Sequence, residues 1–158
     1  MPNWAEQVTA IATAIGAIGL VSAIGAAIFA GKQVREARIG RQAEVAADFF
    51  RRWSEDPMVE TRRLVAGYET NEELADAFVH FIATNAHEAY VLFRELDYFE
   101  QLGVLEAHGG FDFGVIRSLL GHRLIERWQL WLPSIDAIGG PGVYPNFARL
   151  VKKMQAAV

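Results

Sequence analysis

Cysteine is missing altogether from the 158 residues of this chain. Disulfide bridges, thiolate zinc sites and catalysis by a thiol are therefore excluded. The absence agrees with a reducing compartment, where protein disulfides are rare. Proline is also scarce, with five residues in all and none from Trp4 to Trp53, so nothing in that stretch forces a helix to end.

The sequence also lacks the short motifs that carry familiar chemistry. It contains no nucleophile elbow, no phosphate-binding glycine loop, and no kinase or dinucleotide fingerprint. No segment alternates apolar and polar residues in the way of a strand, and no internal repeat is present. The sequence therefore predicts an all-α protein that is not an enzyme, and it assigns no cofactor and no metal.

Charge is distributed in three blocks that the net value of -4 hides. Residues 32–53 hold six basic and three acidic side chains. Residues 54–112 hold three basic and thirteen acidic side chains, and residues 113–158 hold six basic and two acidic ones. An acidic middle argues against a nucleic-acid surface, which needs clustered Lys and Arg facing phosphates. Packing of the acidic and basic blocks on each other, within one chain or between subunits, would explain why the chain has an acidic middle and a basic C-terminal third.

Hydrophobic residues make up 52% of the chain and are concentrated near the N-terminus. Val8 to Ala30 is a run of 23 residues without a charge, and about 20 suffice to cross a hydrocarbon core as a helix. A signal peptide would begin with basic residues, whereas Met1 to Gln7 contains Glu6 and neither Lys nor Arg. A buried helix of this length would need a larger domain around it. The run predicts one transmembrane helix.

The charges beside this run predict its orientation. Four cations that would contact lipid headgroups follow it, namely Lys32, Arg35, Arg38 and Arg41. Because no basic residue precedes it, the positive-inside rule places the C-terminal domain in the cytoplasm and the N-terminus outside the inner (cytoplasmic) membrane. Trp4 lies at the outer boundary, where indole rings favour the interface.

Small residues recur through the predicted span at spacings of four and three: Ala12, Gly16, Gly19, Ala23, Ala26 and Ala30. In lipid, helices associate through close backbone approach, so this seam favours a homo-oligomer. The alternative explanation of this spacing is that Gly and Ala are common in membrane helices whether or not the helices associate. The hydroxyls of Thr9, Thr13 and Ser22 would line a pore if they faced a ring axis, but such groups more often bond their own backbone.

The chain is predicted to divide at residues 1–31, 32–53 and 54–158: a tail with its transmembrane helix, a basic amphipathic helix, and a cytosolic helical bundle. Within the bundle, Asp56 is expected to cap a short helix that ends near Gly67, and Thr70 with Glu73 forms a capping box. That box should open one long helix to Gly103, bent near Asn85. Asp112 should cap the next helix, Pro133 should end or kink it, and Pro145 should open the last.

The segment RELDYFEQLGVLEAHGGFD, the Trp128 and Trp131 pair before Pro133, and YPNFARL near the end carry a resemblance. They resemble bacterial single-pass membrane proteins with a helical domain of unknown function. The likeness covers most of the chain after Lys32, through core aromatic residues and turns. It implies an architecture and a location, and it supplies no catalytic residue.

The histidines are the only candidates for metal or acid–base chemistry. His80, His87, Glu88 and Glu95 would lie on the long helix, with the two imidazoles two turns apart on one face. Metal sites of helical proteins use tighter sets, such as His-Glu-x-x-His, so ordinary surface and core positions are favoured. His108 and His122 are expected at the surface or in caps. An acidic run at Glu69, Glu72, Glu73 and Asp76 suits a helix start, or less readily a basic partner.

These observations favour a membrane-anchored, self-associating scaffold or interaction module at the cytoplasmic face. Its expected partners are membrane lipid, further copies of the chain and an unidentified cytosolic protein. One alternative is a small homo-oligomeric channel. The other is a membrane-tethered enzyme, which would require a buried pocket joining His80 or His87 to Glu88 or Glu95.

Overall fold

A computed structural model describes residues 3–157, with the side chains of residues 5–8 and 10–24 outside its described part. The chain divides into two compact units, Met1–Ala43 and Glu44–Val158. Across the described residues there are six α-helices, one short 3-10 helix and no strand. The all-α prediction is confirmed.

Helix α1 extends over Trp4–Trp53, as the absence of proline predicts. Most of the predicted span from Val8 to Ala30 falls outside the residues whose side chains are described, and so do Ala12, Gly16, Gly19 and Ala23 of the small-residue seam. Ala26 and Ala30 are described, and both are exposed. Among the residues that were described, no helix combines the length and apolar character needed to cross a membrane.

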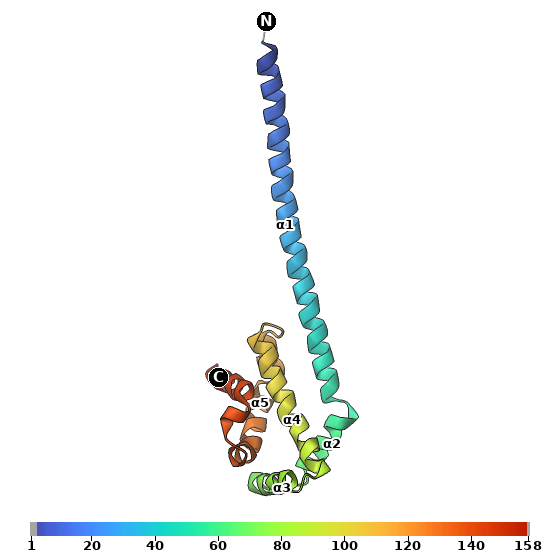
Figure 1. The fold of residues 1–158 in the computed structure, drawn as a ribbon, viewed down its shortest axis with the longest axis vertical. Helices are drawn as coiled ribbons and strands as arrows, with labels where there is room; N and C mark the ends of the chain where they lie inside the picture. The colour runs from blue at the N-terminus through green and yellow to red at the C-terminus, as the bar shows by residue number, and fades with distance from the viewer. Residues whose placement is uncertain (1–2, 158) are drawn as a thin grey trace. The chain divides into compact units, whose positions relative to one another are not determined.

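The second unit begins with the last turns of α1 and continues through five further α-helices: α2 (Asp56–Val65), α3 (Asn71–Ala83), α4 (His87–Ala107), α5 (Phe113–Ala137) and α6 (Pro145–Gln155), with the 3-10 turn η1 at Pro141–Val143. Helix α4 contacts α2, α3 and α6, while α5 packs on α3 and α6. Figure 1 shows α4, in yellow, in the middle of this unit. Every other helix of the unit is therefore positioned by α4 or by a helix packed on it.

Two predicted helix starts are confirmed in detail. The Glu73 N–H donates to Thr70 Oγ1 at 3.1 Å, and the Thr70 N–H donates to the Glu73 carboxylate at 3.4 Å, which completes the capping box of α3. Asp112 Oδ1 accepts the Val115 N–H at 3.1 Å at the start of α5. The prediction for α2 is wrong by one residue, because Glu55 is the cap and Asp56 is already helical.

The prediction of one long helix from Thr70 to Gly103, bent near Asn85, is wrong in its continuity, because the helix is broken at the position of the predicted bend. Asn85 has φ of 50°, a left-handed conformation that stops α3, and α4 starts again at His87. Asparagine tolerates this conformation better than most residues, since its short polar side chain bonds locally. Here Asn85 Oδ1 accepts the Tyr90 hydroxyl at 3.0 Å. Pro133 does not end α5, which continues to Ala137.

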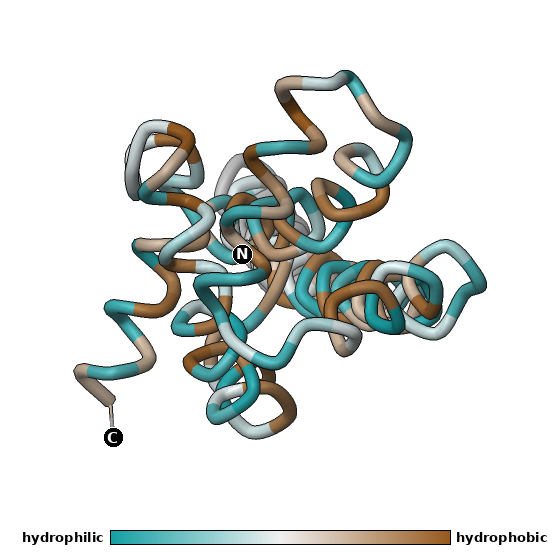
Figure 2. Tube along the Cα trace, turned by 90° about the horizontal axis from the view of Figure 1, so that it is seen from below, coloured by the Kyte–Doolittle hydropathy of each residue, from teal (hydrophilic) through white to brown (hydrophobic). Residues whose placement is uncertain are grey.

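The core of the second unit is built from the apolar faces of these helices. Figure 2 shows hydrophobic and hydrophilic segments alternating along the helical turns, as amphipathic helices require. Phe49, at the end of α1, is fully buried and packs on Tyr98 with ring centroids 4.0 Å apart. The Tyr98 hydroxyl donates to the Phe49 carbonyl at 3.2 Å. The end of α1 is therefore part of this core.

Helices α4 and α6 meet along a polar strip. Glu100 accepts the backbone N–H groups of Asn146 and Phe147 at the start of α6, at 3.1 and 2.9 Å. Glu106 pairs with Arg149 at 2.7 Å and with Lys153 at 2.6 Å. Together with the ion pair between Arg127 and Glu95, these contacts confirm that the acidic and basic blocks pack on each other within one chain.

Gly103 lies between Glu100 and Glu106, where the backbones of α4 and α6 approach closely. A Cβ atom at this position would collide with the carbonyl group of Asn146. We therefore expect Gly103→Ala to destabilise the domain by about 2–3 kcal/mol, the usual cost of overpacking a well-packed contact. Chemical unfolding of the full chain in detergent, followed by near-ultraviolet circular dichroism, would measure it.

Gly121→Ala is the matched control, because a Cβ there would make only ordinary contacts at 3.8 and 3.9 Å. Its helix propensity should keep the domain as stable as the wild type or raise its stability by up to about 1 kcal/mol. Equal stability of the two variants would show that the close approach of α6 to Gly103 does not limit the stability of the domain.

Candidate ligand pocket

A carboxyl group that the protein interior encloses lies next to the pocket and is linked to it by Arg127, which lines the pocket. The Glu95 side chain on α4 is 0% exposed, and Arg127 on α5 reaches it with Nε 3.3 Å from Oε1. Neither oxygen of Glu95 accepts a hydrogen bond of good geometry from the described residues, and the neighbouring indole N–H of Trp131 is likewise unpaired. Buried carboxylates are usually better satisfied than this.

Burial raises the pKa of Glu95 above its ordinary value of 4.5. The charge of Arg127, the nearby Trp131 N–H and the charge of Arg62 act in the opposite direction but do not cancel the effect. Trp131 therefore contributes as a dipole even though its hydrogen bond to Glu95 is not fully formed. The carboxyl group takes up a proton more readily here than in water.

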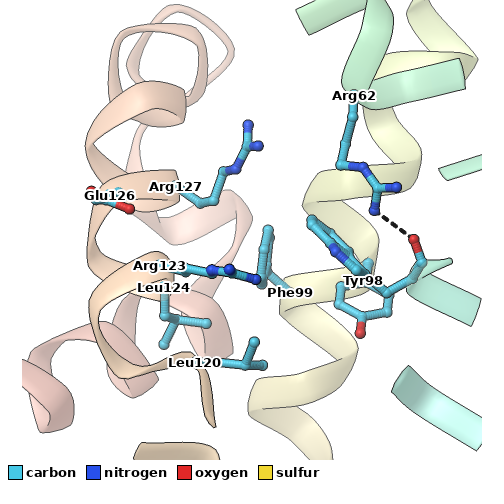
Figure 3. Close-up of a pocket in the computed structure, with 9 residues that line it drawn as sticks. Arg62, Tyr98, Phe99, Leu120, Arg123, Leu124, Glu126 and Arg127 are labelled. Atoms are coloured by element: carbon cyan, nitrogen blue, oxygen red, sulfur yellow. Dashed lines mark hydrogen bonds between the residues drawn. The ribbon is translucent and has the colours of Figure 1, made fainter. Parts of the chain in front are cut away.

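A cavity of about 340 Å³ opens near this carboxyl group, between α5 and the elements that face it. Figure 3 shows side chains entering the space from both sides, with Arg123 and Arg127 on α5 and Arg62 on α2. The apolar part of the wall comes from Trp53, Tyr98, Phe99, Leu120 and Leu124. The pocket thus combines three guanidinium groups with an aromatic and aliphatic surface.

Arg62 is held in place by the packing of α2 on α4. Its neighbour Thr61 is fully buried and donates to the Val91 carbonyl of α4 at 2.8 Å. Arg62 Nη1 donates to the Trp53 carbonyl at 2.6 Å, and its guanidinium lies 4.8 Å from the centre of the Trp53 ring. A cation at the end of α1 satisfies a carbonyl that has no partner within the helix.

The α5 side of the pocket follows from helical spacing. Leu120, Arg123, Leu124 and Arg127 are three or four residues apart and therefore share one face. Arg123 is exposed, and no ion pair or hydrogen bond joins it to another described residue. Glu126 also borders the pocket, but it pairs with His122 at 3.1 Å and lies on the far side of α5 from Arg62 in Figure 3.

The predicted histidine candidates do not belong to this pocket. His80 is on α3 and His87 opens α4, so the break at Asn85 separates the two imidazoles that were expected on one face. Both are exposed, as is Glu88, and only Glu95 of that group is buried beside the cavity. Within the described part of the chain, no group of three or more His, Asp or Glu residues is arranged to hold a metal.

The two remaining histidines lie where they were expected. His108 is exposed at the end of α4, with Nδ1 2.9 Å from the Val104 carbonyl, and His122 is exposed on α5. The three arginines of the pocket were not predicted as a group. One signal was available, since Glu95 falls at a core position of α4 beside Leu92 and Leu96, and a carboxylate there requires a cation from another helix.

Neither a protein-family model, nor a curated protein, nor a solved structure matches this chain. The resemblance to bacterial single-pass proteins with a helical domain of unknown function therefore stays a prediction. The two tryptophans of that resemblance contribute to the packing of the helical domain. Trp131 is fully buried, and Trp128 packs edge-on against the buried Phe147 at 4.9 Å.

The raised pKa of Glu95 makes the stability of the domain depend on pH. The folded state holds the proton more tightly than the unfolded state, so this contribution is fully present below the ordinary pKa of 4.5 and is lost as pH rises through the folded value. A glutamine side chain at this position does not titrate. We expect the stability of Glu95→Gln relative to the wild type to rise with pH in that window, by at most about 1.4 kcal/mol per pH unit.

Urea unfolding of both proteins over a series of pH values from acid to neutral would measure this difference. A difference that falls with increasing pH would mean that the attraction of Arg127 and Arg62 outweighs burial. The pKa of Glu95 would then be lowered in the folded state.

Proposed function

We propose that this chain is a membrane-anchored module that self-associates through its first helix and presents a helical interaction domain at the cytoplasmic face. The observation that carries the proposal is that one helix, α1, contains both the uncharged run Val8–Ala30 and the aromatic residues of a domain core. Phe49 is fully buried, and Tyr98 bonds its carbonyl. A helix of this kind joins a membrane anchor to a folded domain without an intervening linker sequence.

The described end of the uncharged run supports contact with lipid. Ile28 and Phe29 are 69% and 62% exposed, which is unusual for adjacent large apolar side chains unless another apolar phase covers them. The cations Lys32, Arg35, Arg38 and Arg41 follow within the next turns, and all four are exposed. Apolar side chains followed by a basic segment are typical of a helix that leaves a bilayer on its cytoplasmic side.

The described part of the small-residue seam is accessible to a second helix. Ala26 and Ala30 are exposed, and a Cβ atom at the neighbouring Gly25 or Gly31 would meet nothing within 4 Å. The channel alternative depends on a face of small residues or of the hydroxyls of Thr9, Thr13 and Ser22, and the side chains of Thr13 and Ser22 lie outside the described residues. The enzyme alternative required a buried pocket joining His80 or His87 to Glu88 or Glu95, and both histidines and Glu88 are exposed. Self-association for scaffolding is therefore the hypothesis we pursue.

Because the chain has no cysteine, single cysteines can report its topology. We expect Asn3→Cys to react with an impermeant maleimide in intact bacterial cells, and Ala157→Cys to react only after permeabilisation, since the four cations hold the C-terminal side inside. The protein should also stay in membranes during alkaline carbonate extraction. Labelling of Ala157→Cys in intact cells would reverse the orientation, and release by carbonate would rule out the anchor.

The oligomer contact is tested by enlarging two residues of the seam. Gly16→Ile with Gly19→Ile should lower crosslinking in membranes several-fold, because bulky side chains prevent the close backbone approach on which helix pairing in lipid depends. Ile15→Leu with Ile18→Leu changes the adjacent face at nearly constant volume and should have little effect. If the seam variant inserts and crosslinks like the wild type, the contact lies elsewhere.

A further inference from the structure

The arginines of the pocket exceed what Glu95 requires. Arg127 already provides a cation at 3.3 Å for that carboxyl group, whose raised pKa favours the neutral form. Arg62 and Arg123 bring two further positive charges to the same cavity, so its three lining arginines outnumber Glu126, the acidic residue in the lining. The hydrogen bond of Arg62 goes to a neutral carbonyl, and no described side chain neutralises Arg123. Like charges that converge in one cavity repel, and a bound anion relieves the repulsion.

The remaining wall of the pocket defines the rest of the ligand. Trp53, Tyr98, Phe99, Leu120 and Leu124 form an apolar surface beside the guanidinium groups. The cavity of about 340 Å³ is at the lower end of the range for small-molecule sites, about 300–1,000 Å³. A compact group with an apolar portion fits this volume, whereas a bare inorganic ion would leave the aromatic wall in contact with water.

We propose that this pocket binds a phosphate monoester attached to an apolar body. Such a phosphate carries a charge of about -1.5 to -2 at pH 7, which matches the two arginines that Glu95 does not need. Guanidinium groups bind phosphate through paired N–H donors, and their planar faces also stack on aromatic rings. The phosphate lies between Arg62, Arg123 and Arg127, and the apolar body lies against Trp53 and Phe99. The proposal depends on this pocket alone and not on the membrane anchor.

Two sources supply this chemistry, a soluble phosphate monoester and the headgroup of phosphatidic acid. The test therefore uses the full chain in nanodiscs of neutral phosphatidylcholine, with phenyl phosphate as the probe and isothermal titration calorimetry as the measurement. We expect about one phenyl phosphate per chain with an affinity in the millimolar range or tighter. Inorganic phosphate should bind about tenfold more weakly, because it lacks the apolar body.

Arg123→Gln is the decisive variant, since Arg123 is exposed and its loss breaks no described contact of the fold. It should weaken phenyl phosphate binding about tenfold, the loss expected for one charge-assisted hydrogen bond. Arg117→Gln is the matched control, because Arg117 is an exposed arginine on the same helix outside the pocket lining. It should change the affinity less than about twofold. Equal melting curves would show that both variants are folded.

Nanodiscs that contain phosphatidic acid distinguish the two sources. Weaker binding of phenyl phosphate to the wild type in such discs than in discs with an equal content of phosphatidylglycerol, which is anionic but carries no phosphate monoester, identifies the headgroup of phosphatidic acid as a ligand of the pocket. Unchanged binding identifies a soluble ester. Absence of phenyl phosphate binding, equal losses in the two arginine variants, or equal affinity for inorganic phosphate would overturn the proposal, while the anchor and its orientation would remain as tested above.

Discussion

The arrangement of the domain depends on finding partners for the glutamates of α4. Glu95 and Glu106 are buried, and a buried carboxylate without a partner costs several kcal/mol. Glu106 receives Arg149 and Lys153 from α6, and Glu100 receives the first backbone N–H groups of the same helix. Glu95 receives Arg127 from α5. Helices α5 and α6 therefore bring a cation or backbone N–H groups to each of the three carboxylates, with hydrogen bonds at Glu100 and Glu106 but none of good geometry at Glu95. Gly103 lets α6 come close enough to reach Glu100 and Glu106.

The pKa values of two of these glutamates are shifted in opposite directions. For Glu106, burial alone would raise the pKa, but the hydrogen bonds and charges of Lys153 and Arg149 lower it overall. For Glu95, burial prevails over Arg127, Trp131 and Arg62, and the pKa is raised. The difference lies in the deeper burial of Glu95 and in the hydrogen bonds, which favour the ionised form of Glu106 and are incomplete at Glu95. Glu106, whose hydrogen bonds are complete, links α4 to α6. Glu95, whose hydrogen bonds are incomplete, lies beside the pocket, and groups with a shifted pKa commonly occur at functional sites.

Several local features could be read from the sequence because they depend on neighbouring residues. The capping box at Thr70, the cap at Asp112 and the last helix from Pro145 were predicted correctly. The continuous helix through Asn85 was predicted incorrectly, because the periodic apolar residues on both sides of the break keep a helical spacing. A single asparagine in a left-handed conformation interrupts such a pattern without changing it. Pro133 was expected to end or kink α5, and the helix does not end there but continues to Ala137.

The sequence by itself determined the all-α class and the helix that leads from the uncharged run to Trp53. It also predicted that the acidic and basic blocks pair, but it left open whether they do so within one chain or between subunits. These properties follow from periodicity, from the absence of proline and from the distribution of charge. Only the tertiary structure decided which arginines meet which glutamates. Arg62, Glu95 and Arg127 come from three helices far apart in sequence, and no local pattern encodes their convergence. Their meeting is fixed by the packing of α2 on α4 and of α5 on α3 and α6, because packing depends on contacts between side chains that the linear sequence keeps apart.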